Sequence, residues 1–261
     1  MTNLKDVFLL DLEYLETFSN RIETSWGSIF HNESQSNYYD ANHAHIVDAV
    51  ENPKLIIDEV KEFYNSKDII PRFYIYNLDA QKELMDQLKL DDFGFEELIN
   101  PVQLWEEKFL KQKENKDISI ELVTKKNYSE ALNIECSISE FGGKAVREKA
   151  FEVEFNHSSF IHYLLRYNGI ACATACIFTT GNQARMESVA TLEEYRGQGL
   201  IGKLIYYIQE EVAKKKLTSL WVFPINEKIE KVYQKYGFKT VAKLKMGHAF
   251  LGGRSIKEIQ G

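Results

Sequence analysis

The sequence predicts an α+β fold, in which a mixed, mostly antiparallel sheet is flanked by helices and preceded by a smaller α/β domain. Residues 160–192 contain strand-like apolar runs interrupted by Asn168-Gly169 and Gly181-Asn182, and such dipeptides are typical of tight hairpin turns. Residues 199–216 then place apolar side chains at helical spacing. Hairpin-linked strands followed by such a helix are typical of an antiparallel sheet with a helix packed on one face.

A polar run near the middle of the chain predicts a linker. Residues 110–119, LKQKENKDIS, consist largely of lysine, glutamine, glutamate, asparagine and aspartate. At 261 residues the chain is also long for a single domain. We therefore expect an N-terminal α/β domain over residues 1–112 and a second domain over residues 117–261.

The N-terminal domain is expected to alternate helices and strands. Apolar residues from Leu4 to Phe18 recur at helical spacing, which predicts a helix over residues 1–24. The next segment, 25–47, is polar and aromatic without clear periodicity, and we expect a loop with local order there. The remaining elements are expected in this order: a helix over 52–65, a strand over 69–77, a helix over 79–94 and an extended segment over 95–109.

The C-terminal domain is expected to follow the order β-α-α-β-β-β-α-β-α-β. Its most regular element is the helix over 199–216, because apolar residues from Leu200 to Val212 share one stripe. The other elements are expected in this order: a strand over 118–124, a helix over 125–139, a glycine-containing loop over 140–146, a helix over 147–159, the three strands of 160–192, a strand over 217–224, a helix over 226–237 and a strand over 238–246.

Two segments of the chain resemble each other. Residues 73–98 and 220–244 each contain a strand, an asparagine, a helix, a Gly-Phe pair and a second strand. Residues 1–110 can therefore be interpreted as a diverged copy of part of the C-terminal half. The likeness can equally be a coincidence, because short helices that end at Gly-Phe are common.

The composition excludes several classes of protein. A net charge of −7 argues against a general nucleic-acid binder, which needs a basic face. The N-terminal apolar run carries acidic residues, unlike a secretory signal, and no apolar run approaches the ~20 residues that span a bilayer. We therefore expect a cytoplasmic protein with no nucleic-acid partner and no membrane partner.

The three cysteines predict neither a disulfide framework nor a metal site. Cys136, Cys172 and Cys176 are few and odd in number, as in proteins of a reducing compartment. Cys172 and Cys176 would share one face of a strand, where the simplest interpretation is a pair of small apolar core residues. No metal cofactor is expected.

The glycines of ESVATLEEYRGQGLIGKLIYYI, residues 187–208, allow three interpretations. The run from Gly197 gives G-x-x-x-x-G-K, but Leu204 stands where a nucleotide-triphosphate loop needs a magnesium-binding hydroxyl. The same glycines give G-x-G-x-x-G, but a dinucleotide fold needs a parallel sheet and more chain than follows them. The third interpretation is R-G-x-G at a helix start after an antiparallel strand, where free N–H groups and the helix dipole bind a pyrophosphate. The third interpretation fits best.

The segments VATLEEYRGQGLIGKLI and NEKIEKVYQKYGFK resemble the GNAT superfamily of acetyl-coenzyme A dependent N-acetyltransferases. The resemblance covers roughly residues 117–250. It implies a GNAT-like fold, acetyl-CoA as cosubstrate, and an acceptor amine on a small molecule or a peptide. The chain departs from the family loop at one position, because Ile201 stands where a small residue is common and Gly202 follows one residue later.

The resemblance also implies roles for individual residues. Tyr233 matches the tyrosine that protonates the leaving thiolate, and the backbone N–H of Val189 matches the group that polarises the thioester carbonyl. Nothing in residues 1–110 resembles the glycine loop, so one cofactor per chain is expected. The implied cofactor-binding residues are Val189, Thr191, Arg196, Gly197, Gln198, Gly199, Leu200, Ile201, Gly202 and Asn226.

Several assignments stay open. Asn226 also fits a simple helix N-cap, and Tyr233 also fits a core residue. Glu187 and Glu140 are candidates for the general base, although each also fits a surface carboxylate; Phe141 is a candidate for the acceptor pocket. The leading hypothesis is transfer of an acetyl group from acetyl-CoA to a primary amine by direct attack in a ternary complex. The alternative is a non-catalytic module that binds acyl-CoA as a sensor.

Overall fold

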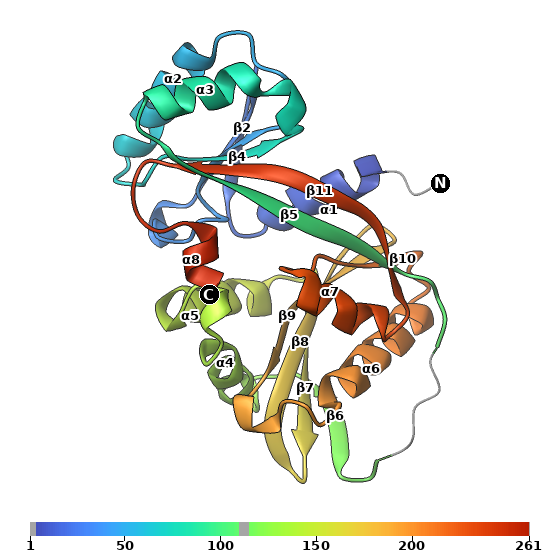
Figure 1. The fold of residues 1–261 in the computed structure, drawn as a ribbon. Helices are drawn as coiled ribbons and strands as arrows, with labels where there is room; N and C mark the ends of the chain where they lie inside the picture. The colour runs from blue at the N-terminus through green and yellow to red at the C-terminus, as the bar shows by residue number, and fades with distance from the viewer. Residues whose placement is uncertain (1–3, 110–114, 261) are drawn as a thin grey trace. The chain divides into compact units, whose positions relative to one another are not determined.

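The computed structural model describes residues 4–109 and 115–260 and has the mixed α/β class that the sequence predicts (Figure 1). Helices and strands alternate through most of the chain, and the strands pair into sheet. Contacts divide the chain into two compact units. Within the described ranges, unit 1 comprises residues 4–11 and 101–242, and unit 2 comprises residues 12–100 and 243–260.

Unit 1 has the order of elements that the sequence predicts for the C-terminal half. Its elements are β5 (Gly94–Trp105, from Pro101 on), β6 (Ile118–Leu122), α4 (Tyr128–Cys136), α5 (Lys144–Asn156), β7 (Phe160–Tyr167), β8 (Ile170–Thr180), β9 (Gln183–Thr191), α6 (Leu200–Lys214), β10 (Ser219–Val222), α7 (Glu227–Gln234) and the first part of β11 (Phe238–Phe250). β6 to β9 are antiparallel neighbours in chain order. β10 then pairs in parallel with β9 and antiparallel with β5.

The two predicted hairpin turns connect β7, β8 and β9. Asn168 and Gly169 have φ angles of 50° and 80°, and Gly181 has a φ of 52°. These left-handed conformations match the twist of the flanking strands, and they favour glycine and asparagine. The local sequence thus explains why three successive strands fold back on one another.

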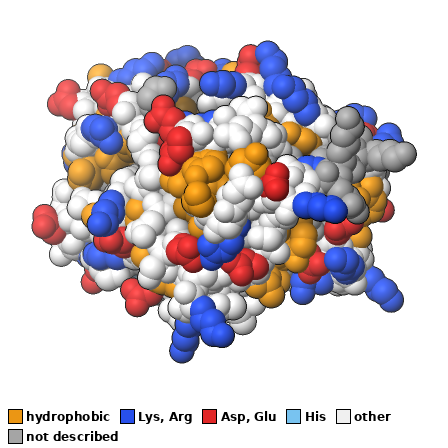
Figure 2. All heavy atoms as spheres, turned by 90° about the horizontal axis from the view of Figure 1, so that it is seen from below, with side chains coloured by type: hydrophobic (Ala, Val, Ile, Leu, Met, Phe, Trp, Pro, Cys, Tyr) orange, Lys and Arg blue, Asp and Glu red, His pale blue; other side chains and the backbone are white. Residues whose placement is uncertain are grey.

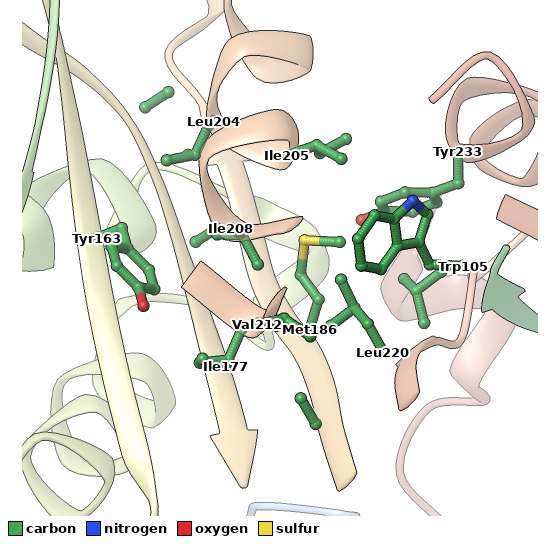
Figure 3. Packing of buried hydrophobic residues seen from close by; sticks show 14 of the residues in the cluster. Trp105, Tyr163, Ile177, Met186, Leu204, Ile205, Ile208, Val212, Leu220 and Tyr233 are labelled. Carbon is green, nitrogen blue, oxygen red and sulfur yellow. The ribbon is translucent and has the colours of Figure 1, made fainter. Parts of the chain in front are cut away.

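α6 packs its predicted apolar stripe against the sheet of unit 1. Leu204 and Ile208 are fully buried, and Leu200 and Val212 are nearly so. Figure 3 shows Leu204, Ile205 and Ile208 of α6 reaching into a core that also contains Tyr163, Trp105 and Tyr233. This burial is the main physical reason why the helix forms, since most helical stability in proteins comes from packing of an apolar face.

The two faces of the unit 1 sheet carry different cores. Tyr163 and Leu165 of β7 belong to the core under α6, whereas Leu164 belongs to a second core with residues of α4 and α5. Successive strand residues point to opposite faces, so this alternation is expected. The helices α4 and α5 therefore cover the face that α6 does not.

Unit 2 repeats the alternation of strands and helices around its own core. Its described elements are the end of α1 (Leu4–Leu15), β1 (Asn20–Thr24), β2 (Gly27–His31), β3 (His43–Ile46), α2 (Pro53–Asn65), β4 (Arg72–Tyr76), α3 (Lys82–Leu90), the first part of β5, the last part of β11 and α8 (Ile256–Gln260). β1, β2, β3 and β4 are neighbours in this order, and β11 follows β4. Ile57, Phe73 and Ile75 are fully buried in its core.

Two predictions for unit 2 are wrong. The helix predicted over residues 1–24 ends at Leu15, and residues 20–24 form β1. The loop predicted over residues 25–47 contains β2 and β3. These strands are too short to show a clear hydrophobic period, and their conformation depends on pairing with neighbouring strands. At Gly27 a side chain would overlap the carbonyl oxygen of His45, so only glycine permits this close approach.

β5 and β11 each contribute residues to both units, so neither unit is one continuous stretch of the chain. β5 follows α3 in the chain but pairs in unit 1 with β10, at Leu104↔Trp221. β11 follows α7 but pairs in unit 2 with β4, at Tyr76↔Met246. Residues 110–114 of the predicted linker lie outside the described residues. The two segments proposed as an internal repeat have matching elements: β4, α3 and the start of β5 in the first, and β10, α7 and the start of β11 in the second.

On the face drawn in Figure 2, basic and acidic side chains are interspersed, so neither sign dominates it. No helix in residues 4–109 or 115–260 combines the length and the apolar character needed to cross a membrane.

Candidate active site

β9 carries a bulge in its C-terminal half. Its register against β8 passes from Glu187 opposite Cys176 to Ala190 opposite Thr174, so two residues of β9 face one residue of β8. Ser188 has a φ of 51°, a left-handed conformation that non-glycine residues rarely adopt. The bulge takes backbone groups near Ser188 and Val189 out of the regular ladder. The left-handed conformation of Ser188 was not predicted, because serine has no particular preference for it.

β9 also has a free edge next to the bulge. β10 pairs only with Gln183, Ala184 and Arg185, although β9 continues to Thr191. In the described register, residues 186–191 therefore have no partner strand on the β10 side. Free backbone donors and acceptors along a strand edge can bind an extended ligand as an added strand would.

The glycine loop that follows β9 is shaped by two left-handed residues. Gly197 and Gly199 have φ angles of 79° and 75°, and an added Cβ at either position would meet nothing within 4 Å. Among the described residues, the N–H of Arg196 donates to Glu193 and that of Gly202 donates to Gly199, and no backbone bond uses the N–H groups between them. These groups lie at the N-terminus of α6, where backbone N–H groups and the helix dipole attract phosphate.

Gly202 has a packing role, whereas the family resemblance implied that it binds the cofactor. In the structure Gly202 is buried, and an added Cβ would lie 2.5 Å from Tyr236 Oη and closer still to two ring carbons. Its N–H is already bonded to the carbonyl of Gly199 at 3.1 Å. The absence of a side chain at Gly202 thus lets the Tyr236 ring rest directly on α6.

The polar side chains of the loop remain at the surface. Arg196 is exposed, and its Nε donates to the Thr191 carbonyl at 3.1 Å, which holds the guanidinium beside the end of β9. Gln198 is exposed, and its Nε2 lies 3.4 Å from the Glu194 carbonyl. Arg196 therefore adds one positive charge beside the free N–H groups, as an anion site requires.

The apolar residues of the predicted site contribute their backbone only. Leu200 is buried in the unit 1 core, and Val189 and Ile201 are partly buried against the same core, which also contains Tyr233. This core brings together the bulged strand, the start of α6 and α7. The sequence departure at Ile201 is accommodated because its side chain packs inward, away from a loop-side ligand.

α7 supplies the last two predicted residues. Asn226 is the N-cap of α7, and its side-chain oxygen accepts from the Ile229 N–H at 3.0 Å. Tyr233 is buried and packs edge-on against Phe238, with ring centroids 5.6 Å apart. Burial raises the pKa of the Tyr233 phenol, and the negative charge of Glu187 raises it further. The phenol is therefore protonated at neutral pH.

Glu187 is the carboxylate whose charge contributes to the raised pKa of Tyr233. Its side chain is 20% exposed and pairs with Arg185, which also binds Asp11 at 2.5 Å. Burial raises the pKa of the Glu187 carboxyl group, while the positive charge of Arg185 opposes that change. A partly buried carboxylate with a raised pKa is a candidate for proton transfer, and its charge influences the Tyr233 phenol electrostatically.

The other two residues expected on the acceptor side lie in the loop between α4 and α5. Glu140 accepts a hydrogen bond from Ser139 at 3.0 Å, a local contact within the loop. Phe141 is partly buried, and its ring lies 5.7 Å from the guanidinium carbon of Arg147. Of the two candidate bases, Glu187 is the one whose charge influences the pKa of Tyr233.

In unit 2 the start of α2 occupies the same place in the order of elements as the start of α6 in unit 1, but its residues do not suit a phosphate. β3 and β4 are parallel and flank α2, as β9 and β10 flank α6. Residues 47–52, which connect β3 to α2, contain no glycine, and Pro53 at the first turn of α2 has no N–H to offer. A hollow of about 550 Å³ beside α2 is lined by the carboxylates of Glu51, Asp58 and Glu83 and by Lys54, whose ammonium group is paired with Asp58 and Asp91. Carboxylates outnumber the one lysine of this lining, so the hollow is poorly suited to a pyrophosphate.

Comparisons with known proteins agree with this geometry. Residues 129–238 match the acetyltransferase (GNAT) family. No curated protein sequence matches the chain.

Three solved structures share the fold over most of the chain. A functionally unknown conserved protein from Staphylococcus epidermidis is 15% identical with a TM-score of 0.74, covering 95% of this chain and 97% of that one. A GCN5-related N-acetyltransferase from Kribbella flavida is 16% identical with a TM-score of 0.67, covering 95% of each chain. A GCN5-related N-acetyltransferase-like protein from Streptococcus suis is 13% identical with a TM-score of 0.55, covering 90% and 89%. At these identities the likeness concerns the fold. Residues 129–238 thus carry the match to the GNAT acetyltransferase family, and these solved structures agree with it in fold.

Proposed function

We propose that the chain transfers the acetyl group of acetyl-CoA to a primary amine of a small molecule or peptide, by direct attack in a ternary complex. The match to the GNAT family supports acetyl transfer at the level of the family. One feature of this chain carries the proposal: β9 is bulged at Ser188, has a free edge after Arg185, and leads into the glycine loop at the start of α6.

The residues around β9 and α6 fit acetyl-CoA. The free N–H groups between Arg196 and Gly202 would bind the pyrophosphate, and the open space beside Gly197 and Gly199 would admit it. The free edge of β9 would pair with the amides of the pantetheine arm. Acetyl-CoA supplies the acetyl group as an activated thioester.

Three groups would handle the charge and the protons of the transfer. The N–H of Val189, beside the bulge, would polarise the thioester carbonyl. Glu187, whose pKa is raised, would accept a proton from the attacking amine. Tyr233, whose phenol stays protonated, would donate a proton to the leaving thiolate. The Glu187 charge raises the pKa of Tyr233, so loss of that charge when Glu187 takes up a proton makes Tyr233 a better acid.

The test is release of coenzyme A thiol from acetyl-CoA in the presence of small amines and peptides with free N-termini or lysines. We expect one class of amine to give turnover, and Tyr233→Phe to lower kcat by about 10²- to 10⁴-fold, because it removes a general acid. The matched control is Tyr207→Phe, a partly buried tyrosine of α6 that packs edge-on against Tyr163 with ring centroids 5.7 Å apart. This control should retain wild-type kcat within about twofold, since it removes one hydroxyl group outside the proposed site.

Other outcomes have distinct meanings. If Tyr233→Phe and wild type turn over equally, Tyr233 is a core residue and not the acid. If coenzyme A binds but no amine is acetylated across a broad panel, the chain is an acyl-CoA sensor. If coenzyme A does not bind, the assignment of the glycine loop is wrong.

A further inference from the structure

A buried group of three potential metal ligands lies on the face of unit 1 that α4 and α5 cover. Glu154 is on α5, His162 is on β7 and Cys176 is on β8. Their exposed fractions are 1%, 5% and 0%, so all three are shielded from solvent. One ligand atom from each, a carboxylate oxygen, a ring nitrogen and the sulfur, lie within 4.8 Å of one another.

The fold itself aligns these side chains. His162 and Cys176 are direct partners in the register of β7 and β8, so they point to the same face of the sheet. α5 packs on that face with Arg147, Phe151 and Glu154 buried along one side. The group is therefore built from three rigid elements and not from loops.

His162 has no hydrogen bond in this environment. Neither ring nitrogen has a partner among the described residues, and Nε2 lies 4.0 Å from Glu154 Oε2. A polar atom buried without a partner destabilises a fold, because it has lost its hydrogen bonds to water. The imidazole points at the other two ligands, so a bound cation would satisfy it.

Arg147 connects Glu154 to a second buried carboxyl group. Arg147 binds Glu135 at 2.6 Å and Glu154 through both carboxylate oxygens, one of them at 3.0 Å. Two buried carboxyl groups thus share one buried guanidinium. Arg147 holds Glu154 in place as an outer partner, the role that such hydrogen bonds commonly have around metal ligands.

We propose that Glu154, His162 and Cys176 bind one divalent transition-metal cation of the zinc type. Carboxylate, imidazole and thiolate together are ligands that Zn²⁺ accepts in a tetrahedral site, with a fourth position left for water. Ligand atoms of such a site lie roughly 3.3–3.7 Å apart, so the three side chains close by about 1 Å when the metal binds. Cys176 binds as the thiolate, and its proton is released to solvent. The cation ties α5 to β7 and β8. Glu187 of β9 is the register partner of Cys176, so it lies next to this group.

Cobalt(II) provides a direct test, because it reports thiolate ligation and tetrahedral geometry through its absorption spectrum. The full chain is stripped with a chelator and titrated with Co²⁺ and then Zn²⁺, in a Cys136→Ser background that removes the partly exposed thiol. We expect one equivalent of Co²⁺, a thiolate charge-transfer band and displacement by Zn²⁺. Cys176→Ser should abolish the band. The matched control is Cys172→Ser, which alters a fully buried cysteine of the same strand and should keep it.

A second measurement covers the case in which Cys176→Ser does not fold. X-ray absorption at the zinc edge of the unaltered chain should show one sulfur at about 2.3 Å among nitrogen and oxygen ligands. The proposal is overturned if the folded chain binds no stoichiometric metal, if zinc has nitrogen and oxygen ligands only, or if the band persists in Cys176→Ser and disappears in Cys172→Ser.

Discussion

Replacing Gly202 with alanine tests whether this glycine serves packing and not cofactor binding. An added Cβ would lie 2.5 Å from Tyr236 Oη and closer to two carbons of the ring. Non-bonded carbons keep about 3.5–4.0 Å apart, so the ring or the helix must move by roughly 1 Å or more. The Tyr236 main chain resists this shift, because its carbonyl accepts from Gln209 Nε2 at 2.7 Å and its N–H donates to Tyr233 at 2.8 Å.

The expected magnitude follows from two opposing effects. Overpacking of this kind lowers the free energy of unfolding by about 1–3 kcal/mol. Alanine favours a helix over glycine by up to about 1 kcal/mol, and less in the first turn, where Gly202 lies. We therefore expect Gly202→Ala to lower the free energy of unfolding by about 1–2 kcal/mol.

A double-mutant cycle with Tyr236→Ala measures the contact itself. Urea unfolding is followed for wild type, Gly202→Ala, Tyr236→Ala and the double variant. Without the ring, the new methyl group has room, and only the helix preference remains. Gly202→Ala should then be neutral or stabilising by up to about 1 kcal/mol. An equal loss of stability in both backgrounds would refute the packing argument.

Coenzyme A binding separates the packing glycine from the loop glycines. Gly202→Ala should keep its affinity within a few-fold, because the Gly202 N–H is already bonded to Gly199. Gly199→Ala forces an alanine into a φ of 75°, which costs about 1–2 kcal/mol and distorts the loop. Its affinity should fall about tenfold or more in calorimetry. The opposite ranking of the two variants would show that the N–H groups of the loop are wrongly assigned.

Three further predictions concern pH and stoichiometry. Burial raises the pKa of Glu187, so kcat/KM should decline as pH falls through that raised pKa. Glu187→Gln should remove this pH dependence along with most of the rate. If Glu187→Gln leaves the pH profile unchanged, Glu187 is excluded as the base. Burial lowers the pKa of His248 from 6.5 to about 4, so between these values only the unfolded chain binds the proton. The free energy of unfolding should then fall with decreasing pH by up to about 1.4 kcal/mol per unit for this group, and His248→Gln should flatten the slope measured by urea unfolding from pH 7 to 4.5. Calorimetry should give one coenzyme A per chain, because the acidic start of α2 lacks the glycine loop; two equivalent sites would contradict this.

Much of the fold was predictable because its signals are local. Asn168-Gly169 and Gly181 mark turns through their own backbone preferences, and the stripe from Leu200 to Val212 repeats with the period of the helix. The failures have the opposite character. β2 and β3 have four or five residues each, and their strand conformation depends on partners that are distant in sequence.

The sequence alone determined the glycine loop, the order of elements in the C-terminal half and the resemblance to acetyltransferases, because each depends on residue types at fixed short spacings. The tertiary structure decided the rest. It divided β5 and β11 between the two units, bulged β9 at Ser188 and set Tyr236 against Gly202. It also brought Glu154, His162 and Cys176 together from a helix and two strands. Such features arise from packing between segments that are far apart in the chain, and no local pattern of residues encodes the distances between them.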